Sequence, residues 1–163
     1  FFGGGPWTRI LHPFLGVLMF LSFAGLMLKV WHHNKITEAD KKWLTAVSEV
    51  VSGHEETLQD VGRYNGGQKV LFWIMVACMF VLLVSGIMFW QPWFADAFPI
   101  GLRRLAVLLH ALSAAVLIIG VIVHVYAAIW VKGTIRAMTR GSVSEAWARK
   151  HHPAWHREMT RNG

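Results

Sequence analysis

The sequence predicts an all-α membrane protein, a single domain over residues 1–163 built as a bundle of transmembrane helices. Of the 163 residues, 55% are hydrophobic, and the chain holds nine Trp and ten Phe. Three apolar runs are each long enough to cross about 30 Å of hydrocarbon as a helix. Trp residues stand at the ends of these runs, where amphipathic rings favour the membrane interface.

The first predicted span covers residues 8–31 and contains ILHPFLGVLMFLSFAGLMLKVW. Pro13 is expected in the first turns of this helix, where a missing backbone N–H is tolerated. The second span covers residues 68–90 and is stopped by Pro92. The third covers residues 102–131, and at about 1.5 Å per residue it exceeds the hydrocarbon thickness, so it must tilt or project.

The distribution of basic residues predicts the orientation of these spans. The loop 32–67 and the tail 132–163 carry most of the Lys and Arg, whereas the opposite side offers only Arg9, Arg103 and Arg104. The positive-inside rule therefore puts the loop and the tail in the cytoplasm. The first span then begins outside, and the chain starts FFGGGPW without Met, so we expect a further transmembrane helix before Phe1.

Composition also excludes several classes of protein. The net charge of +7 is explained by basic cytoplasmic segments, and no soluble domain is present to bind nucleic acid. Cys78 is the single cysteine, which excludes an intrachain disulfide and a CxxC-type metal site. The stretch KKWLTAVSEVV in the loop is amphipathic, and it can be a helix at the membrane surface or an ordinary helix packed on the bundle.

The third span carries His110 and His124, and polar rings in hydrocarbon are costly unless something satisfies them. Fourteen residues at 100° each fall 40° short of four turns, so both rings lie on nearly one face, about 21 Å apart along the axis. One metal ion cannot bridge that distance, but two large cofactors stacked across the membrane can. Haem b fits, because imidazole is a good axial ligand and the macrocycle is apolar.

Each haem needs a second ligand at the same depth. His110 lies twenty residues before Trp130, and His12 lies nineteen before Trp31, so His12 and His110 are expected partners. A lone intramembrane histidine more often serves packing or proton transfer, so the haem interpretation depends on His12, His110 and His124 together.

The sequence contains no second histidine at the depth of His124 that could bind the same haem. His32–His33 lie about 10 Å too low by helix rise, and His54 lies in the loop, which again suggests a missing helix that bears a histidine. His32–His33 and His151–His152 are expected at the interface or in solvent.

Seven stretches resemble the gamma subunit, a cytochrome b, of membrane-bound respiratory formate dehydrogenases. They are RILHPF at 9–14, KVWHHN at 29–34, DVGRYNGGQK at 60–69, VSGIMFWQPWFA at 84–95, LLHA at 108–111, HVYAAIWVKGTI at 124–135 and WARKHHPAWHRE at 147–158. The resemblance implies a four-helix subunit with two haems b. One haem would be held on the periplasmic side by His12 and His110, and the other on the cytoplasmic side by His124 and a histidine on a first helix that this sequence lacks.

The resemblance further implies a quinone site at Asn65, Gly67 and Gln68 beside His124. Amide groups can hydrogen-bond a quinone oxygen, and glycine allows close backbone approach. NGGQK can also be simply a turn and a helix start. The sequence leaves open whether the quinone is menaquinone or ubiquinone.

By resemblance, the chain carries electrons across the bacterial inner membrane. They would come from a periplasmic molybdenum or tungsten catalytic (alpha) subunit through an iron–sulfur (beta) subunit and reach the quinone pool. The chain itself has no residues for formate chemistry. The expected partners are these subunits, membrane lipid and quinone, but no nucleic acid, and a higher oligomer of the complex is open. The alternatives are the diheme cytochrome b subunit of a membrane-bound nickel–iron hydrogenase or related oxidoreductase, and a proton-conducting or anchoring protein without haem.

Overall fold

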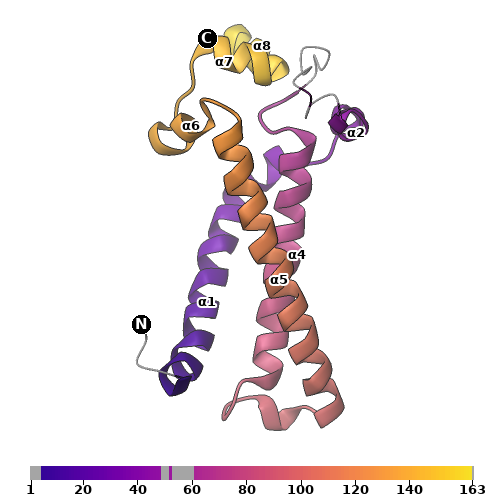
Figure 1. Ribbon diagram of the computed structural model, residues 1–163, viewed down its shortest axis with the longest axis vertical. Coiled ribbons are helices and arrows are strands. Elements are labelled where there is room, and N and C mark those ends of the chain that lie inside the picture. The colour runs from indigo at the N-terminus through magenta and orange to yellow at the C-terminus, as the bar shows by residue number, and fades with distance from the viewer. Residues whose placement is uncertain (1–4, 49–51, 53–60, 163) are drawn as a thin grey trace. The chain divides into compact units, whose positions relative to one another are not determined.

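The computed structural model describes residues 5–48, 52 and 61–162, and within these residues it contains helices and no strand (Figure 1). Two compact units are present. Unit 1 comprises Phe1–Val30 and Ile74–Val121, and unit 2 comprises Trp31–Trp73 and Ile122–Gly163. The division passes through two of the long helices.

The three predicted spans are confirmed as helices. Among the described residues, Gly5–Asn34, Gly66–Phe89 and Ile100–Trp130 are long and apolar enough to cross a membrane. The helices and short 3-10 turns follow in the order α1 (Gly5–Val30), η1 (Trp31–Asn34), α2 (Glu38–Thr45), α4 (Gly66–Phe89), η3 (Ala95–Ala97), α5 (Ile100–Trp130), α6 (Thr134–Arg140), α7 (Glu145–His151) and α8 (Pro153–Asn162).

Helix α1 begins three residues earlier than the sequence predicted. Pro13 therefore lies inside the helix rather than in its first turns. A proline there lacks the N–H that would bond the carbonyl of Arg9, and its ring crowds that carbonyl. Membrane helices tolerate such a residue because neighbouring groups can satisfy the freed carbonyl.

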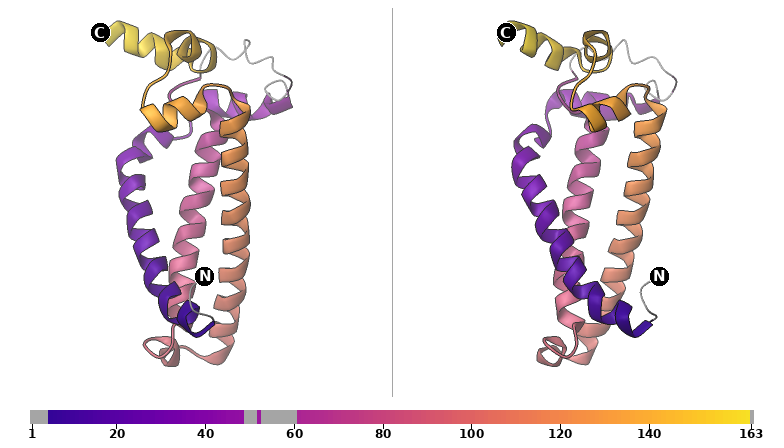
Figure 2. Two further views of the ribbon diagram at one scale, coloured as in Figure 1. Left: turned by 60° about the vertical axis from the view of Figure 1, so that its left-hand side comes forward. Right: turned by 90° about the vertical axis from the view of Figure 1, so that its left-hand side faces the viewer.

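Unit 1 has a thin core and an apolar surface. Only small or flexible hydrophobic side chains, such as those of Met79 and Ala106, are buried between its helices. By contrast, Leu18, Leu28 and Ile118 are each at least 60% exposed. Figure 2 shows α4 and α5 running side by side away from the turn that joins them. Long apolar faces of this kind are what lipid, rather than water, covers.

Unit 2 contains the start of α4, the end of α5 and the short helices α2, α6, α7 and α8, of which α7 packs against α8. Helix α2 lies beside the first turn of α4 (Figure 1), where the indole of Trp43 covers Gly67. This packing favours the second interpretation of the amphipathic stretch, an ordinary helix packed on the protein. Val50 and Val51, which were expected on its apolar side, lie outside the described residues.

Candidate functional site

Helices α1 and α5 bring the rings of His12 and His110 together in unit 1. The two ring centroids lie 6.1 Å apart, with 73° between the ring planes. A metal ion bound at about 2 Å by one nitrogen of each of two imidazoles separates their centroids by about 6 Å. The spacing therefore fits two imidazoles that would hold one metal ion between them.

Ser85 of α4 orients His110. The Ser85 hydroxyl donates to the carbonyl of Val81 at 2.5 Å, so its oxygen is left to accept from Nδ1 of His110 at 3.0 Å. In this direction of the bond, Nδ1 would carry the proton and Nε2 would keep the lone pair that a metal requires. Ser85 is only 3% exposed, so water does not compete for this contact.

Two glycines shape the surroundings of the histidine pair. A side chain at Gly86 would begin 3.3 Å from Cε1 of His110, so only glycine lets this ring lie against α4 without displacement. At Gly16, one turn after His12, a Cβ atom would meet no other atom within 4 Å. The pair thus has a close wall on α4 and open space on α1, and the residues present fit a bound haem.

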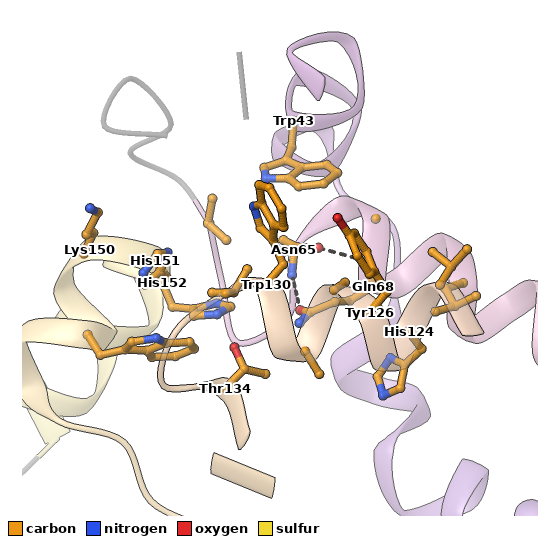
Figure 3. Close-up of a pocket in the computed structure, with 18 residues that line it drawn as sticks. Trp43, Asn65, Gln68, His124, Tyr126, Trp130, Thr134, Lys150, His151 and His152 are labelled. Atoms are coloured by element: carbon orange, nitrogen blue, oxygen red, sulfur yellow. Dashed lines mark hydrogen bonds between the residues drawn. The ribbon is translucent and has the colours of Figure 1, made fainter. Parts of the chain in front are cut away.

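A second candidate site, in unit 2, is a cavity of about 550 Å³. Its lining includes all four residues predicted for quinone binding, which are Asn65, Gly67, Gln68 and His124 (Figure 3). The volume lies in the range of small-molecule sites, and most of the lining is apolar with a few polar groups.

Asn65 and Gln68 form a reciprocal cap at the start of α4. The backbone N–H of Gln68 donates to Oδ1 of Asn65 at 2.9 Å, and the N–H of Asn65 donates to Oε1 of Gln68 at 3.0 Å (Figure 3). This is a capping box, so the interpretation of NGGQK as a helix start is correct. Because the cap uses only the amide oxygens, both NH₂ groups retain their donors.

The structure gives a different reason for glycine at position 67. A Cβ atom there would lie 2.9 Å from two ring atoms of Trp43, and one at Gly66 would lie 2.7 Å from the carbonyl oxygen of Asp40. Both glycines therefore allow α2 to lie against the first turn of α4. Trp43 also lines the cavity, so this packing forms one of its walls.

A buried ion pair fixes α2 in this position. Nζ of Lys69 lies 2.7 Å from Oδ2 of Asp40, with the side chains 8% and 7% exposed, and it also donates to the carbonyl of Lys35 at 3.1 Å. Burial alone raises the pKa of Asp40, but hydrogen bonds from Lys69 and Thr37 and the Lys69 charge outweigh it and hold this pKa below its ordinary value. The carboxylate therefore stays ionised at neutral pH.

The tail contributes residues that the sequence analysis assigned to the surface. His152 was expected at the interface or in solvent, but it is 6% exposed, and its Nδ1 donates to the carbonyl of Gly62 at 2.7 Å. Trp147 donates from Nε1 to the carbonyl of Lys132 at 2.8 Å. Trp147, His151 and His152 all line the cavity. The stretch WARKHHPAWHRE at 147–158 carried part of the family resemblance, but nothing in its spacing predicted a cavity wall.

His124 differs from His110 in its surroundings. It is exposed, and among the described residues it has no hydrogen bond, ring contact or ion pair. In Figure 3 its ring lies at one end of the cavity, and His151 and His152 lie at the other. The part of the chain that the structure describes contains no group of three or more His, Cys, Asp or Glu side chains that could hold a metal ion.

The chain is similar to known membrane cytochromes over most of its length. The family model of the prokaryotic cytochrome b561 proteins matches residues 1–141. The cytochrome b556(fdo) subunit of formate dehydrogenase from Escherichia coli K12 is 49% identical over 152 residues, which are 93% of this chain and 71% of that protein. The nitrate-inducible cytochrome b556(Fdn) subunit from the same strain is 44% identical over 158 residues, 97% of this chain and 73% of that protein.

A third relative is the formate dehydrogenase cytochrome b556 subunit of Haemophilus influenzae, which is 47% identical over 151 residues, 93% of this chain and 63% of that protein. These similarities extend over most of the chain. The chain therefore belongs to the prokaryotic cytochrome b561 family, among the cytochrome b556 subunits of formate dehydrogenases.

Proposed function

We propose that this chain is the membrane subunit of a formate dehydrogenase that carries electrons from the formate-oxidising part of the complex to quinone. In this proposal His12 and His110 would hold one haem b, and His124 would help to hold a second. Haem iron supplies one-electron transfer when bound. The observation that carries the proposal is the 6.1 Å spacing of His12 and His110, which fits a metal between them.

The cavity beside His124 supports quinone as the acceptor. The NH₂ groups of Asn65 and Gln68 are donors, and a quinone carbonyl oxygen is an acceptor. Such donors stabilise the negative charge that develops on this oxygen during reduction. Reduction of one quinone to quinol takes up two electrons and two protons. Lys150, His151 and Tyr126 also line the cavity, and their side chains are of types that donate hydrogen bonds.

The distribution of basic residues supports an orientation of the chain, from which we infer the direction of electron transfer. The loop 32–67 and the tail 132–163 are rich in Lys and Arg, so we place them in the cytoplasm of a bacterium, with the membrane being the inner membrane. The His12–His110 pair would then lie toward the periplasm and receive electrons from an iron–sulfur subunit and a molybdenum or tungsten catalytic subunit. Protons for quinone reduction would come from the cytoplasmic side, so turnover would contribute to the membrane potential.

The similarity to formate dehydrogenase subunits favours this donor over a nickel–iron hydrogenase. The two complexes would be distinguished by the subunits that co-purify. A nickel–iron large subunit in place of a pterin-containing one would overturn the assignment to formate.

Spectroscopy of the purified complex tests the proposal directly. Formate added without oxygen is expected to produce a reduced b-type alpha band, and a quinone analogue added next is expected to remove it. A complex prepared with haem supplied that shows no such band would refute the cytochrome assignment for this chain. A band that formate reduces but quinone does not reoxidise would refute the quinone part alone.

A further inference from the structure

Arg103, in the first turns of α5, has an unused buried donor. Its Nε atom is fully buried and has no hydrogen-bond partner among the residues that the structure describes. The side chain lines a cavity of about 330 Å³ together with Phe89, Gln91 and Arg104. Buried polar groups in proteins are normally paired, so an orphaned guanidinium nitrogen indicates a partner that belongs there.

Asp96 does not satisfy this arginine. Its Oδ1 lies 3.6 Å from an Nη atom of Arg103, beyond hydrogen-bond distance, and its side chain is 88% exposed. An exposed pair of this kind contributes little, because water competes for both charges. Nε also remains unpaired beside it. Arginine binds a carboxylate best through two parallel N–H donors, and Nε is available for such a pair.

The position of Arg103 on α5 relates it to the histidine pair. Arg103 precedes His110 by seven residues, which is 20° short of two turns, so both lie on nearly one face about 10 Å apart along the axis. Arg104 is rotated by about a third of a turn from that face. Phe89 lies beside both residues. Its ring centroid is 5.2 Å from that of His110, and its side chain also lines the cavity that contains Arg103.

Haem b has two propionate carboxylates on one edge of an otherwise apolar macrocycle. Charged groups are costly in hydrocarbon, so this edge is expected to face the nearer end of the helices. For a haem bound to His110, the nearer end is the start of α5, where Arg103 lies. The carboxylate is also the group that an unpaired guanidinium recognises.

We propose that Arg103 binds a propionate of the haem held by His12 and His110, with Nε as one of its donors. This inference rests on the proposed function, because it requires that haem. Arg104 shares the cavity and the charge but lies off the histidine face, so it serves as the matched control. A phospholipid phosphate offers the same anionic chemistry, and the experiment separates the two sources.

The test uses the whole purified complex with three variants of this chain, R103Q, R103K and R104Q. The measured quantities are the midpoint potential of the haem at His110 and its dependence on pH. Loss of the Arg103 charge is expected to stabilise ferric iron about tenfold, a fall of about 59 mV for one electron. The potential should also become more pH-dependent, because the unpaired propionate titrates at higher pH. R103K should keep most of the potential, and R104Q should change it little.

Equal shifts in R103Q and R104Q, or no shift in either, would overturn the proposal. Loss of bound anionic phospholipid from R103Q, with the haem potential unchanged, would overturn it in favour of a lipid site. If the R103Q complex does not assemble, the proposal is tested with the R103K complex. Lysine keeps the charge but cannot offer two parallel N–H donors. The reduced-minus-oxidised infrared bands of isotope-labelled haem propionates should therefore differ between the R103K complex and the wild type. Unchanged bands would contradict propionate binding.

These outcomes are distinct from failure of the proposed function. A wild-type complex with no b-type band would show that no haem b is bound, which would refute both the proposed function and the role of Arg103. A normal band with R103Q indistinguishable from R104Q removes only the role of Arg103.

Discussion

The surroundings of His110 and His124 differ, although both histidines come from α5. The ring of His110 faces the ring of His12 across 6.1 Å, is held by Ser85, and has Phe89 beside it. The ring of His124 is exposed at one end of a cavity whose polar lining includes two side-chain amides. One place has two imidazoles whose centroids lie 6.1 Å apart. The other has one imidazole and room for a ligand.

This difference separates two tasks within one electron-transfer subunit. A site that only relays electrons works best when its ligands are fixed and water is excluded, since less rearrangement then accompanies each transfer. A site that delivers electrons to a diffusible acceptor needs an opening, donors for the acceptor and access to protons. The next predictions test whether the two regions can be disturbed separately.

His110→Ala is expected to have the largest effect, which is complete loss of one haem with the other retained. The variant removes one axial ligand and leaves His124 and the cavity unchanged. Haem stoichiometry and low-temperature difference spectra of the assembled complex measure the result. His32→Ala is the matched control, because His32 is exposed and outside the pair. Loss of both haems in an assembled complex would show that the two sites are not independent.

Lys69→Met is expected to destabilise the wall of the cavity and to leave the histidine pair intact. Removing one partner of a buried ion pair costs about 3–5 kcal/mol, because the remaining charge of Asp40 is uncompensated. Quinone reduction should then be lost at a clearly lower temperature, whereas the spectrum of the haem at His110 stays unchanged. Lys41→Met breaks an exposed pair with Glu38 and should have little effect. Equal heat sensitivity of the two variants would contradict this role of Lys69.

Ser85→Ala is expected to weaken haem binding at His110 without abolishing it. Loss of a hydrogen bond to the second nitrogen of a metal-bound histidine typically lowers affinity about 10–100-fold. Haem retention during dilution or extraction measures this effect. Ser22→Ala is the matched control, because Ser22 makes the same kind of bond within its helix, to the carbonyl of Leu18, and contacts no histidine. If the two variants retain haem equally, Ser85 does not orient His110.

The sequence was sufficient to predict the spans because hydrophobic length alone determines them. The predicted ranges 8–31, 68–90 and 102–131 differ from α1, α4 and α5 by at most three residues at any end. The start of α4 was placed two residues late, since Asn65 caps the helix and Gly66 begins it. The pairing of His12 with His110 was predicted from depth, and the structure brings these rings together. Their role as haem ligands stays a prediction.

The sequence did not predict contacts that join distant segments. Lys69 pairs with Asp40, and His152 bonds Gly62, yet neither contact leaves a periodic pattern in the chain. Burial of His152 depends on how α7 docks, and local composition does not determine this docking. Ser85 falls in an apolar run where a serine usually bonds its own helix, which it also does here. The partners of His124 stay a prediction.

Asn65→Asp is expected to give the smallest effect and the sharpest test of the cavity. Aspartate keeps the oxygen that caps α4 but lacks the NH₂ group, so the fold and haem content should remain while a donor to quinone is lost. A lost hydrogen bond of about 1.4 kcal/mol lowers kcat/KM for quinone about tenfold. Gln68→Glu makes the same exchange at the other amide and should act in the same direction.

The new carboxylate itself needs a control, which Ser144→Asp provides. Ser144 caps α7 through its hydroxyl, and it is not part of the cavity lining, so this variant adds a charge at a helix start without removing a donor from the cavity. Quinone turnover should be unchanged in Ser144→Asp and lowered in Asn65→Asp, with equal haem content in both. If turnover in Asn65→Asp and Gln68→Glu equals that of the wild type, the amides serve only to start α4, and the quinone must be bound by other residues of the cavity.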